Sequence, residues 1–411
     1  MNDPKATTAM ENPVVRAGAA FCALLVFTVQ FSTTISIAMT FLIFGCWLLS
    51  SQASRLHWTM RYNAVAACAL GLYAILLVGT LYSSAGLLDS LSMLRKYREF
   101  PLLVILLPFM REEKYRRWII FAWVAACVLT LAGSYLQYFG ILPMNEHGSA
   151  TFKSRITHNL FMAFFAFYCI RQLSDSPNRR RIWLWFGAFL LTVLNLFILV
   201  DGRTGQVVLV LLMVLFCFQR LPFRQATILA PLLIVCFGVL VLFGNTGRFN
   251  EGIEQSRNYL AGRQNLDTSM GQRLYFWENS IRLIRERPVF GYGTGSFTQE
   301  FDQITTGKGL STHNPHNEYL MFSVQWGAIG FAAYLYFLSC LWRCSLDLPK
   351  DRRWFAQGLC LSLVVNSLLN STFLDHTEGH WYATLIALCY AGLGPHQGYD
   401  TKVESFVEDS R

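Results

Sequence analysis

The stretch Ile182 to Val200 reads IWLWFGAFLLTVLNLFILV and contains no charged side chain. A helix needs about 20 apolar residues to cross the roughly 30 Å of hydrocarbon in a bilayer. Three arginines, Arg179 to Arg181, precede the run, and Asp201-Gly202-Arg203-Thr204-Gly205 follows it. A long apolar run with charged residues at both ends predicts a membrane-spanning helix.

Runs of this kind recur along the chain. Hydrophobic residues make up 54% of the 411 positions and charged residues 14%, a balance that a soluble core could not bury. We therefore predict an all-α polytopic integral membrane protein with about 12 transmembrane helices and one membrane domain over residues 1–411. The expected spans are Val14–Gln30, Thr33–Leu49, Asn63–Leu81, Leu87–Met110, Trp118–Phe139, His158–Leu173, Ile182–Val200, Gly205–Phe218, Ala226–Phe243, Glu318–Trp342, Gln357–Leu374 and Trp381–Leu393.

Lys and Arg fall mainly in every second connection between these runs. Because cytoplasmic loops retain positive charge, both termini are predicted to be cytoplasmic in a bacterial inner membrane. The first run lacks a small-residue cleavage site, which argues against a removed signal peptide. The net charge of +9 is explained by basic loops beside anionic lipids, so no nucleic-acid partner is expected. The basic loop residues are Arg55, Arg61, Arg111, Lys114, Arg116, Arg117, Arg179, Arg180, Arg181, Arg220, Arg224, Arg343, Lys350, Arg352 and Arg353.

The one long connection covers residues 244–316, between the ninth and tenth expected spans, and is predicted to be periplasmic. Within it, Gln272–Arg287 has apolar residues at helical spacing, and Pro288 should end that helix. Gly291, Gly293 and Gly295 then predict a turn that returns the chain to the membrane. We expect the chemistry to lie in this partly helical loop.

Ionisable residues inside the fourth expected span are a first functional signal, because charge at membrane depth is costly. Arg95, Lys96 and Arg98 lie there with Asp89 and Glu99. One interpretation is an amphipathic interfacial helix that leads into a short span from Pro101. The other is a cationic wall for an anionic lipid head group.

Arg203 is a second signal, on the predicted outer side between two apolar runs. Its guanidinium is either an ordinary interfacial anchor or a planar donor group for phosphate oxygens.

The long loop is a third signal, because it carries eight Lys and Arg residues on the side where the positive-inside rule predicts few. They are Arg248, Arg257, Arg263, Arg273, Arg282, Arg285, Arg287 and Lys308.

The loop ends in His313-Asn314-Pro315-His316-Asn317-Glu318. Two histidines three residues apart raise the possibility of a metal site. Pro315 breaks helical geometry between them and no Cys is near, so no metal is predicted. A single imidazole at the membrane surface suits general-base chemistry. The alternative for His316 is a capping residue at the start of the next helix.

The ordered motifs resemble the O-antigen ligase and polymerase superfamily of bacterial membrane glycosyltransferases. The resemblance runs from about Leu190 to Phe331 and agrees with the topology of the remainder. Its motifs are Gly202-Arg203, Arg273 with Trp277 and Pro288, Gly291-Tyr292-Gly293, His316-Asn317 with Tyr319-Leu320, and Gly327-Ala328-Ile329-Gly330.

This resemblance implies a glycan donor on undecaprenyl pyrophosphate and, for the ligase branch, a sugar hydroxyl of the lipid A core as acceptor. No cofactor, nucleotide or ATP is implied. By position, His316 is expected to be an inverting general base, and Arg203 and Arg273 are expected to hold the pyrophosphate. Further expected substrate-binding residues are His313, Asn317, Arg95, Arg98, Lys153 and Arg155.

Three alternatives remain at this point. An O-antigen polymerase or an O-linking oligosaccharyltransferase would use the same donor, although the compact loop and the lack of a large soluble C-terminal domain favour the ligase. A twelve-span secondary transporter would fit the composition, but transporters concentrate polar groups at the bilayer midplane. We expect a cleft at the outer membrane surface, open sideways to a carrier lipid, with His316 at its floor.

Overall fold

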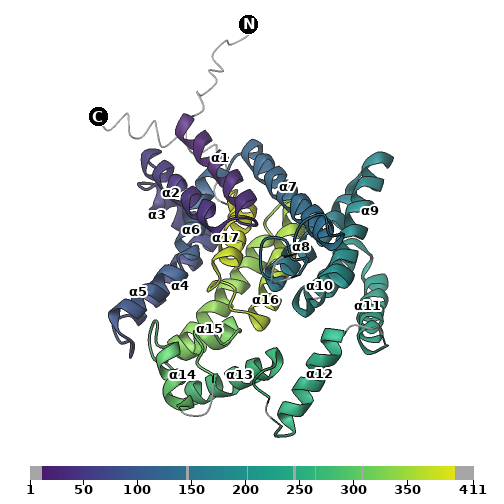
Figure 1. Cartoon of the computed structure of the whole chain (residues 1–411). Helices are drawn as coiled ribbons and strands as arrows, with labels where there is room; N and C mark the ends of the chain where they lie inside the picture. The colour runs from purple at the N-terminus through teal and green to yellow at the C-terminus, as the bar shows by residue number, and fades with distance from the viewer. Residues whose placement is uncertain are drawn as a thin grey trace, which may run out of the picture.

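The computed structural model describes residues 12–144, 148–200, 202–243, 247–263, 265–306 and 310–393, and no β-strand occurs among them. Helices form the whole architecture (Figure 1). Their bounds are α1 Pro13–Thr28, α2 Thr33–Leu49, α3 Leu56–Tyr62, α4 Ala64–Gly79, α5 Leu87–Lys96, α6 Glu99–Leu106, η1 Leu107–Met110, α7 Glu113–Tyr138, α8 Arg155–Asp175, α9 Arg179–Leu194, η2 Asn195–Leu199, α10 Arg203–Arg220, α11 Phe223–Phe243, α12 Gly247–Leu260, α13 Ser269–Glu286, α14 Phe297–Thr305, α15 Glu318–Ser345, α16 Lys350–Leu369 and α17 His376–Tyr390.

A helix lies at each of the expected apolar runs. Among the described residues, four helices are long and apolar enough to cross a membrane individually, and a fifth span results if the bent pair α3 and α4 is counted as one. The four are Glu113–Tyr138, Arg179–Leu199, Arg203–Arg220 and Glu318–Ser345. The structure is thus an all-helical protein with several apolar spans, and the count of twelve stays a prediction.

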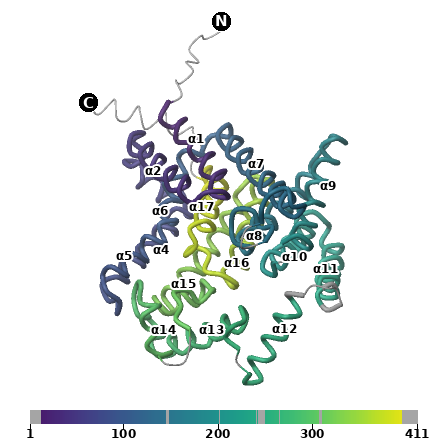
Figure 2. Tube along the Cα trace, in the orientation of Figure 1, coloured from purple at the N-terminus to yellow at the C-terminus, as the bar shows by residue number. Residues whose placement is uncertain are grey.

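Alternate connections meet at opposite ends of the helix bundle. At one end, the Lys153 ammonium donates to Thr33 Oγ1 over 3.1 Å and the Ser84 amide donates to the Tyr292 carbonyl. At the other end, Arg171 donates to the Asp351 carbonyl. The first and fifth connections therefore lie together, and so do the third and ninth. The helices α12, α13 and α14 lie at the lower end of the molecule in Figure 1, and Figure 2 traces the same path.

The fourth expected span is broken at Tyr97, which separates α5 from α6. Arg95 and Lys96 are exposed on α5, whereas every apolar residue of α6 except Ile105 and Pro101 is buried. The Tyr97 hydroxyl donates to Glu318 Oε1 over 2.7 Å, deep inside the protein. The exposed, charged helix followed by a short buried one fits the first sequence interpretation better than one continuous span.

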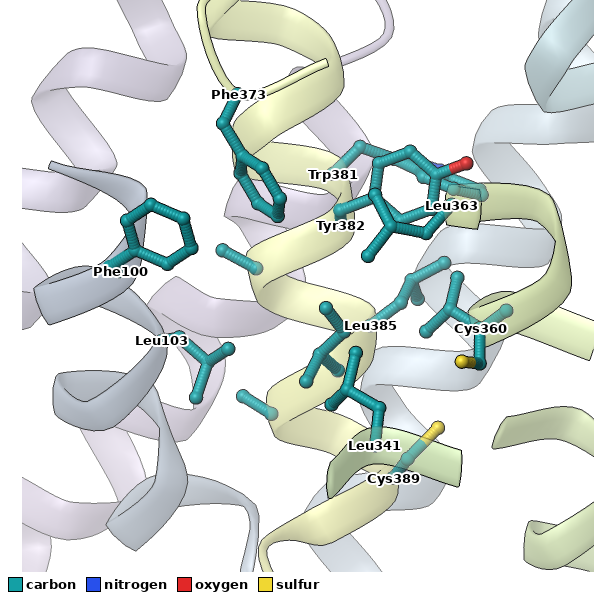
Figure 3. Close-up of a cluster of buried hydrophobic side chains, with 14 of the residues drawn as sticks. Phe100, Leu103, Leu341, Cys360, Leu363, Phe373, Trp381, Tyr382, Leu385 and Cys389 are labelled. Atoms are coloured by element: carbon teal, nitrogen blue, oxygen red, sulfur yellow. The ribbon is translucent and has the colours of Figure 1, made fainter. Parts of the chain in front are cut away.

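Aromatic packing around α17 forms the centre of the protein (Figure 3). Helix α8 is apolar on all sides of its middle section and is buried there, as expected of an internal helix. The Phe161 and Trp381 rings stack at 4.8 Å, and Trp123 meets Tyr168 edge-on at 5.1 Å. Between lipid-embedded helices, such close packing replaces the hydrophobic effect as the main attractive force.

The glycine turn of the long loop is docked against a break in α15. Gly327 has a positive φ of 59° inside that helix, and a Cβ there would lie 2.3 Å from the Val289 carbonyl oxygen. The Tyr292 and Gly293 amides donate to the carbonyls of Val324 and Gln325 over 3.1 and 2.7 Å. Two glycine motifs that are far apart in the sequence therefore form one backbone junction, which fixes the loop helices relative to α15.

Candidate active site

His316 lies in the last turn before α15, held in an uncommon backbone conformation. Its φ is 51°, a region that non-glycine residues seldom occupy. The His316 amide donates to Asn314 Oδ1 over 2.7 Å, and its half-buried ring stacks on Phe276 at a centroid distance of 6.4 Å. The surrounding structure thus determines where the imidazole points.

The helix cap itself is Asn317, whose Oδ1 accepts the Leu320 amide over 3.0 Å. Its Nδ2 donates to the Leu368 carbonyl, and the side chain is buried. The capping function considered for His316 therefore belongs to its neighbour. Asn317, which the sequence offers as a substrate-binding residue, makes contacts that fix the start of α15.

The His316 ring is connected to a buried carboxyl group through one amide. His316 Nδ1 lies 3.3 Å from Asn370 Oδ1, and Asn370 Nδ2 donates to Glu378 Oε2 over 3.1 Å. Glu378 also accepts from Asn366 at the same oxygen and from Thr157 at the other, and it is fully buried. Residues from α8, α16 and α17 thus converge behind the histidine.

Arg273 and Arg203 complete this group from α13 and α10. Burial and the charge of Arg203 lower the pKa of Arg273 to about 10. Burial and the charge of Arg273 lower the pKa of His316, while the hydrogen bond to Asn370 acts in the opposite direction. Arg203 donates to Ser269 Oγ over 2.9 Å at the start of α13. The structure therefore brings together the three residues that the sequence selects first.

A helix begins near each of these arginines for local reasons. Thr268 caps α13 by accepting the Gly271 amide, and Pro288 follows its end at Glu286, close to the predicted bounds. Gly202 and Gly205 lie so close to Asn159 that a Cβ at either position would clash with it. The two glycines thus allow α10 to start against α8 and place Arg203 beside the loop helices.

Lys153 and Arg98 lie in a second polar group around the start of α17. Both are close enough to His376 for their charges to act on its imidazole. Burial lowers the pKa of Lys153, and the charge of Asp375 opposes this effect. The His376 ring stacks on His380 at 3.9 Å, and His380 Nδ1 lies 2.8 Å from Glu99 Oε1.

The remaining candidates are placed elsewhere. His313 is exposed and lines a cavity of about 320 Å³ with Asp89, Lys96 and residues of α5 and α14. Arg95 is exposed on α5, and Arg155 is the half-buried first residue of α8. Of the other sequence signals, Asp201, Gly244 and Lys308 lie outside the described residues.

Sequence reasoning missed the segment from Asn370 to His380. It contributes Asn370, Asp375, His376, Glu378 and His380, all within the two polar groups described above. The signal that could have found them is Asp375-His376-Thr377-Glu378-Gly379-His380, an ionisable stretch between two apolar runs. By the same alternation of connections, it belongs to the end of the bundle that carries His316.

Among the described residues, no three His, Cys, Asp or Glu side chains are grouped so that they could hold a metal ion. Arg273 acts directly on His316, Arg203 acts on Arg273, and a carboxyl group is reached through Asn370. This composition favours binding of an anion next to a histidine.

These features define a polytopic membrane protein with a histidine and arginine site at one end of its helix bundle. Residues 186–335 match the model of the family described as O-antigen ligase, and this region contains Arg203, Arg273 and His316. This part of the chain is therefore similar to O-antigen ligase-type membrane proteins.

An uncharacterized protein of Haemophilus influenzae is 24% identical over 201 residues, which represent 43% of this chain and 48% of that protein. The chain thus spans about half the length of this relative.

Proposed function

We propose that this protein transfers O-antigen polysaccharide from undecaprenyl pyrophosphate to a sugar hydroxyl of the lipid A core, completing lipopolysaccharide. The observation that carries the proposal is the convergence of His316, Arg273 and Arg203 from three distant parts of the chain, all inside the matched region. A half-buried cationic pair beside a histidine suits a reaction in which a pyrophosphate leaves and a hydroxyl loses its proton.

In this mechanism His316 acts as the general base. The acceptor oxygen forms a bond to the anomeric carbon as its proton passes to His316 Nε2. The bond from that carbon to the pyrophosphate oxygen breaks, and the electron pair leaves with the carrier lipid. One displacement inverts the anomeric configuration. The lowered pKa of His316 keeps the imidazole neutral, as a base must be.

Arg203 and Arg273 would hold the pyrophosphate. Two guanidinium groups placed near each other repel, and the repulsion together with burial lowers the pKa of Arg273. A bound pyrophosphate would remove this repulsion and accept hydrogen bonds from both planar groups. Because negative charge on the leaving group grows as the bond breaks, the pair would stabilise the transition state more than the ground state.

The second polar group would contact the rest of the donor or the acceptor. Lys153 and Arg98 lie there, with Arg155 at the start of the neighbouring helix α8. His313 and Arg95 would contact glycan or lipid head groups from the α5 side. In this proposal the loop over residues 244–316 and the site face the periplasm, the termini face the cytoplasm, and membrane lipids surround the chain.

The proposal is tested with purified protein in lipid nanodiscs, supplied with an undecaprenyl-pyrophosphate glycan and lipid A core but no ATP or added metal. His316→Ala, His316→Asn and Arg203→Ala are compared with the wild type. Asn tolerates a positive φ, so His316→Asn removes the imidazole and leaves the turn intact. We expect transfer by the wild type and its loss in all three variants. Full activity of either His316 variant would refute the base assignment, and inhibition by a chelator would refute a metal-independent reaction.

The same assay separates the related activities. A second lipid-linked glycan or an acceptor protein is offered in place of lipid A core. Faster transfer to the lipid-linked glycan than to lipid A core would identify a polymerase. Faster transfer to the acceptor protein would identify an O-linking oligosaccharyltransferase. Solute uptake into proteoliposomes without any glycan transfer would identify a transporter and contradict the proposal.

A further inference from the structure

The orientation of the Asn370 amide follows from its two neighbours. Glu378 Oε2 accepts hydrogen bonds from Asn366 Nδ2 over 2.8 Å and from Asn370 Nδ2 over 3.1 Å. In the structure the amide nitrogen of Asn370 faces the carboxyl group, and its Oδ1 faces His316 Nδ1. An amide oxygen only accepts hydrogen bonds.

This orientation determines which nitrogen of His316 carries the proton. Because Asn370 Oδ1 can only accept, the neutral ring has its hydrogen on Nδ1 and its lone pair on Nε2. Among the described residues Nε2 makes no hydrogen bond. The ring thus presents a basic nitrogen away from Asn370, supported on its face by Phe276.

We propose that Asn370 and Glu378 are positioning residues that hold His316 in the tautomer with Nδ1 protonated. Glu378 fixes the Asn370 amide by accepting a hydrogen bond from its Nδ2, and Asn370 Oδ1 fixes His316 by accepting from Nδ1. This inference rests on the proposed function, because it assigns Nε2 as the atom that takes the acceptor proton. In many hydrolases a third group orients the catalytic histidine in the same way.

Burial makes this connection stable. Glu378 and Asn366 are fully buried, and Asn370 is buried apart from 8% of its surface. Rotation of the Asn370 amide would remove one donor from the buried Glu378 carboxyl group and turn the amide oxygen toward it, which is unfavourable. Glu378 therefore opposes rotation of the Asn370 amide, and the amide in turn opposes a switch of the His316 tautomer.

The charged groups that face His316 come from three helices. Arg273 on α13 lies nearest and lowers the pKa of His316, Arg203 on α10 acts on Arg273, and Glu378 on α17 lies behind Asn370. The hydrogen bond that His316 Nδ1 donates to Asn370 raises that pKa. Loss of this bond should move the acid limb of the activity profile to lower pH, and a carboxylate in its place should move the limb to higher pH.

The test measures kcat, KM and their pH dependence for Asn370→Ala, Asn370→Asp and the double variant Asn370→Asp/Glu378→Gln in the nanodisc assay. The double variant exchanges the amide and the carboxyl group, so that the new amide at position 378 donates to the new carboxylate at position 370, which accepts from His316. Asn366→Ala is the matched control, because it removes a donor from the same Glu378 oxygen without touching His316. Melting temperature and binding of the donor lipid are recorded for each variant.

We expect Asn370→Ala to lower kcat by about tenfold or more, with KM and donor binding nearly unchanged, as for loss of an orienting group. The acid limb of the Asn370→Ala activity profile should move to lower pH. The acid limb of the double variant should move to higher pH, and most of kcat should be recovered. Asn366→Ala should lower the melting temperature and leave the pH profile of activity unchanged. An Asn370→Ala enzyme with wild-type kcat and pH profile would overturn the inference, as would equal profiles in Asn370→Ala and the double variant.

The failure of the proposed function has a different signature. If His316→Asn retains activity, His316 is not the base and the proposed mechanism fails whatever Asn370 does. If His316→Asn is inactive and Asn370→Ala is unaffected, only the positioning assignment fails. A double variant His316→Asn/Asn370→Ala that is no slower than His316→Asn alone would support the dependence of one residue on the other.

Discussion

The indole N–H of Trp277 donates to the carbonyl oxygen of Pro315 over 3.0 Å. This bond joins α13, which carries Arg273, directly to the residue before His316. The cationic side of the site and its histidine are therefore held at a fixed spacing by one side chain. Trp277 itself needs no contact with the substrate to affect the reaction.

Trp277→Phe should remove this bond and keep most of the ring packing. A typical hydrogen bond contributes about 0.5–1.5 kcal/mol to stability, so a small decrease in melting temperature is expected. The transfer rate should fall by about tenfold, because small displacements of catalytic groups are costly. Trp183→Phe is the control, since Trp183 is 62% exposed on α9. Equal rates in the two variants would show that the Trp277 bond does not position the site.

Arg203→Gln should separate activity from stability. The glutamine side chain can still donate to Ser269, but the repulsion between Arg203 and Arg273 disappears. We expect a donor-free protein whose melting temperature equals or exceeds that of the wild type, with donor affinity reduced by at least about tenfold. Binding of the carrier lipid is measured by its effect on the melting temperature. A variant that melts lower and binds normally would argue for a structural role of Arg203.

The positive charge of Arg273 should influence the pH at which the acid limb of the activity profile lies. His316 must be neutral to act as a base, and burial together with the charge of Arg273 lowers its pKa. The wild-type acid limb should therefore lie below the ordinary histidine value of about 6.5. Arg273→Gln removes the positive charge, so the limb should move to higher pH while the maximal rate falls. A limb that stays in place would show that a group other than His316 controls it.

The stability of the folded protein should also depend on the protonation of His316. The pKa of His316 is lower in the folded protein than in the unfolded chain, so the unfolded chain binds more protons at mildly acidic pH. The contribution of His316 to stability is therefore full above about pH 6.5 and decreases as the pH falls through the folded pKa. Below about pH 6.5, the melting temperature of His316→Asn should depend less on pH than that of the wild type.

The sequence predicts features that depend on local patterns. Apolar length places a helix at each expected run, and the end of α13 follows from Pro288. Arg203, Arg273 and His316 are selected because each lies in a short motif of the family that the chain resembles. The sequence does not show how His313 and His316 are placed relative to the site. His316 turns toward Asn370, whereas His313 is exposed beside Asp89 and Lys96.

Features that depend on contacts between distant residues are not visible in the pattern. The break at Tyr97 accompanies a hydrogen bond to Glu318, 221 positions away. Asn370 and Glu378 matter only because His316, from another part of the chain, ends beside them. Single residues of this kind look like ordinary polar positions near the end of a span until the fold brings their partners together.

The junction between the loop and α15 gives a final prediction. Gly327→Ala would introduce a Cβ 2.3 Å from the Val289 carbonyl oxygen at a φ of 59°. Such a conformation costs a non-glycine residue about 1–3 kcal/mol even without a clash. The Pro288 to Gly293 segment should therefore lose its backbone bonds to α15, and α13 should no longer be held in place.

We expect Gly327→Ala to lower the melting temperature and to abolish transfer, with faster proteolysis of the loop between α11 and α15. Gly71→Ala is the matched control. Gly71 also lies in a membrane helix, but a Cβ there meets no atom within 4 Å. Alanine is a better helix former than glycine by about 1 kcal/mol, so this control should be as stable as the wild type or more so. If both alanine variants behave alike, the junction does not hold the loop, and the spacing of Arg273 and His316 must depend on Trp277 and the contacts of α13 alone.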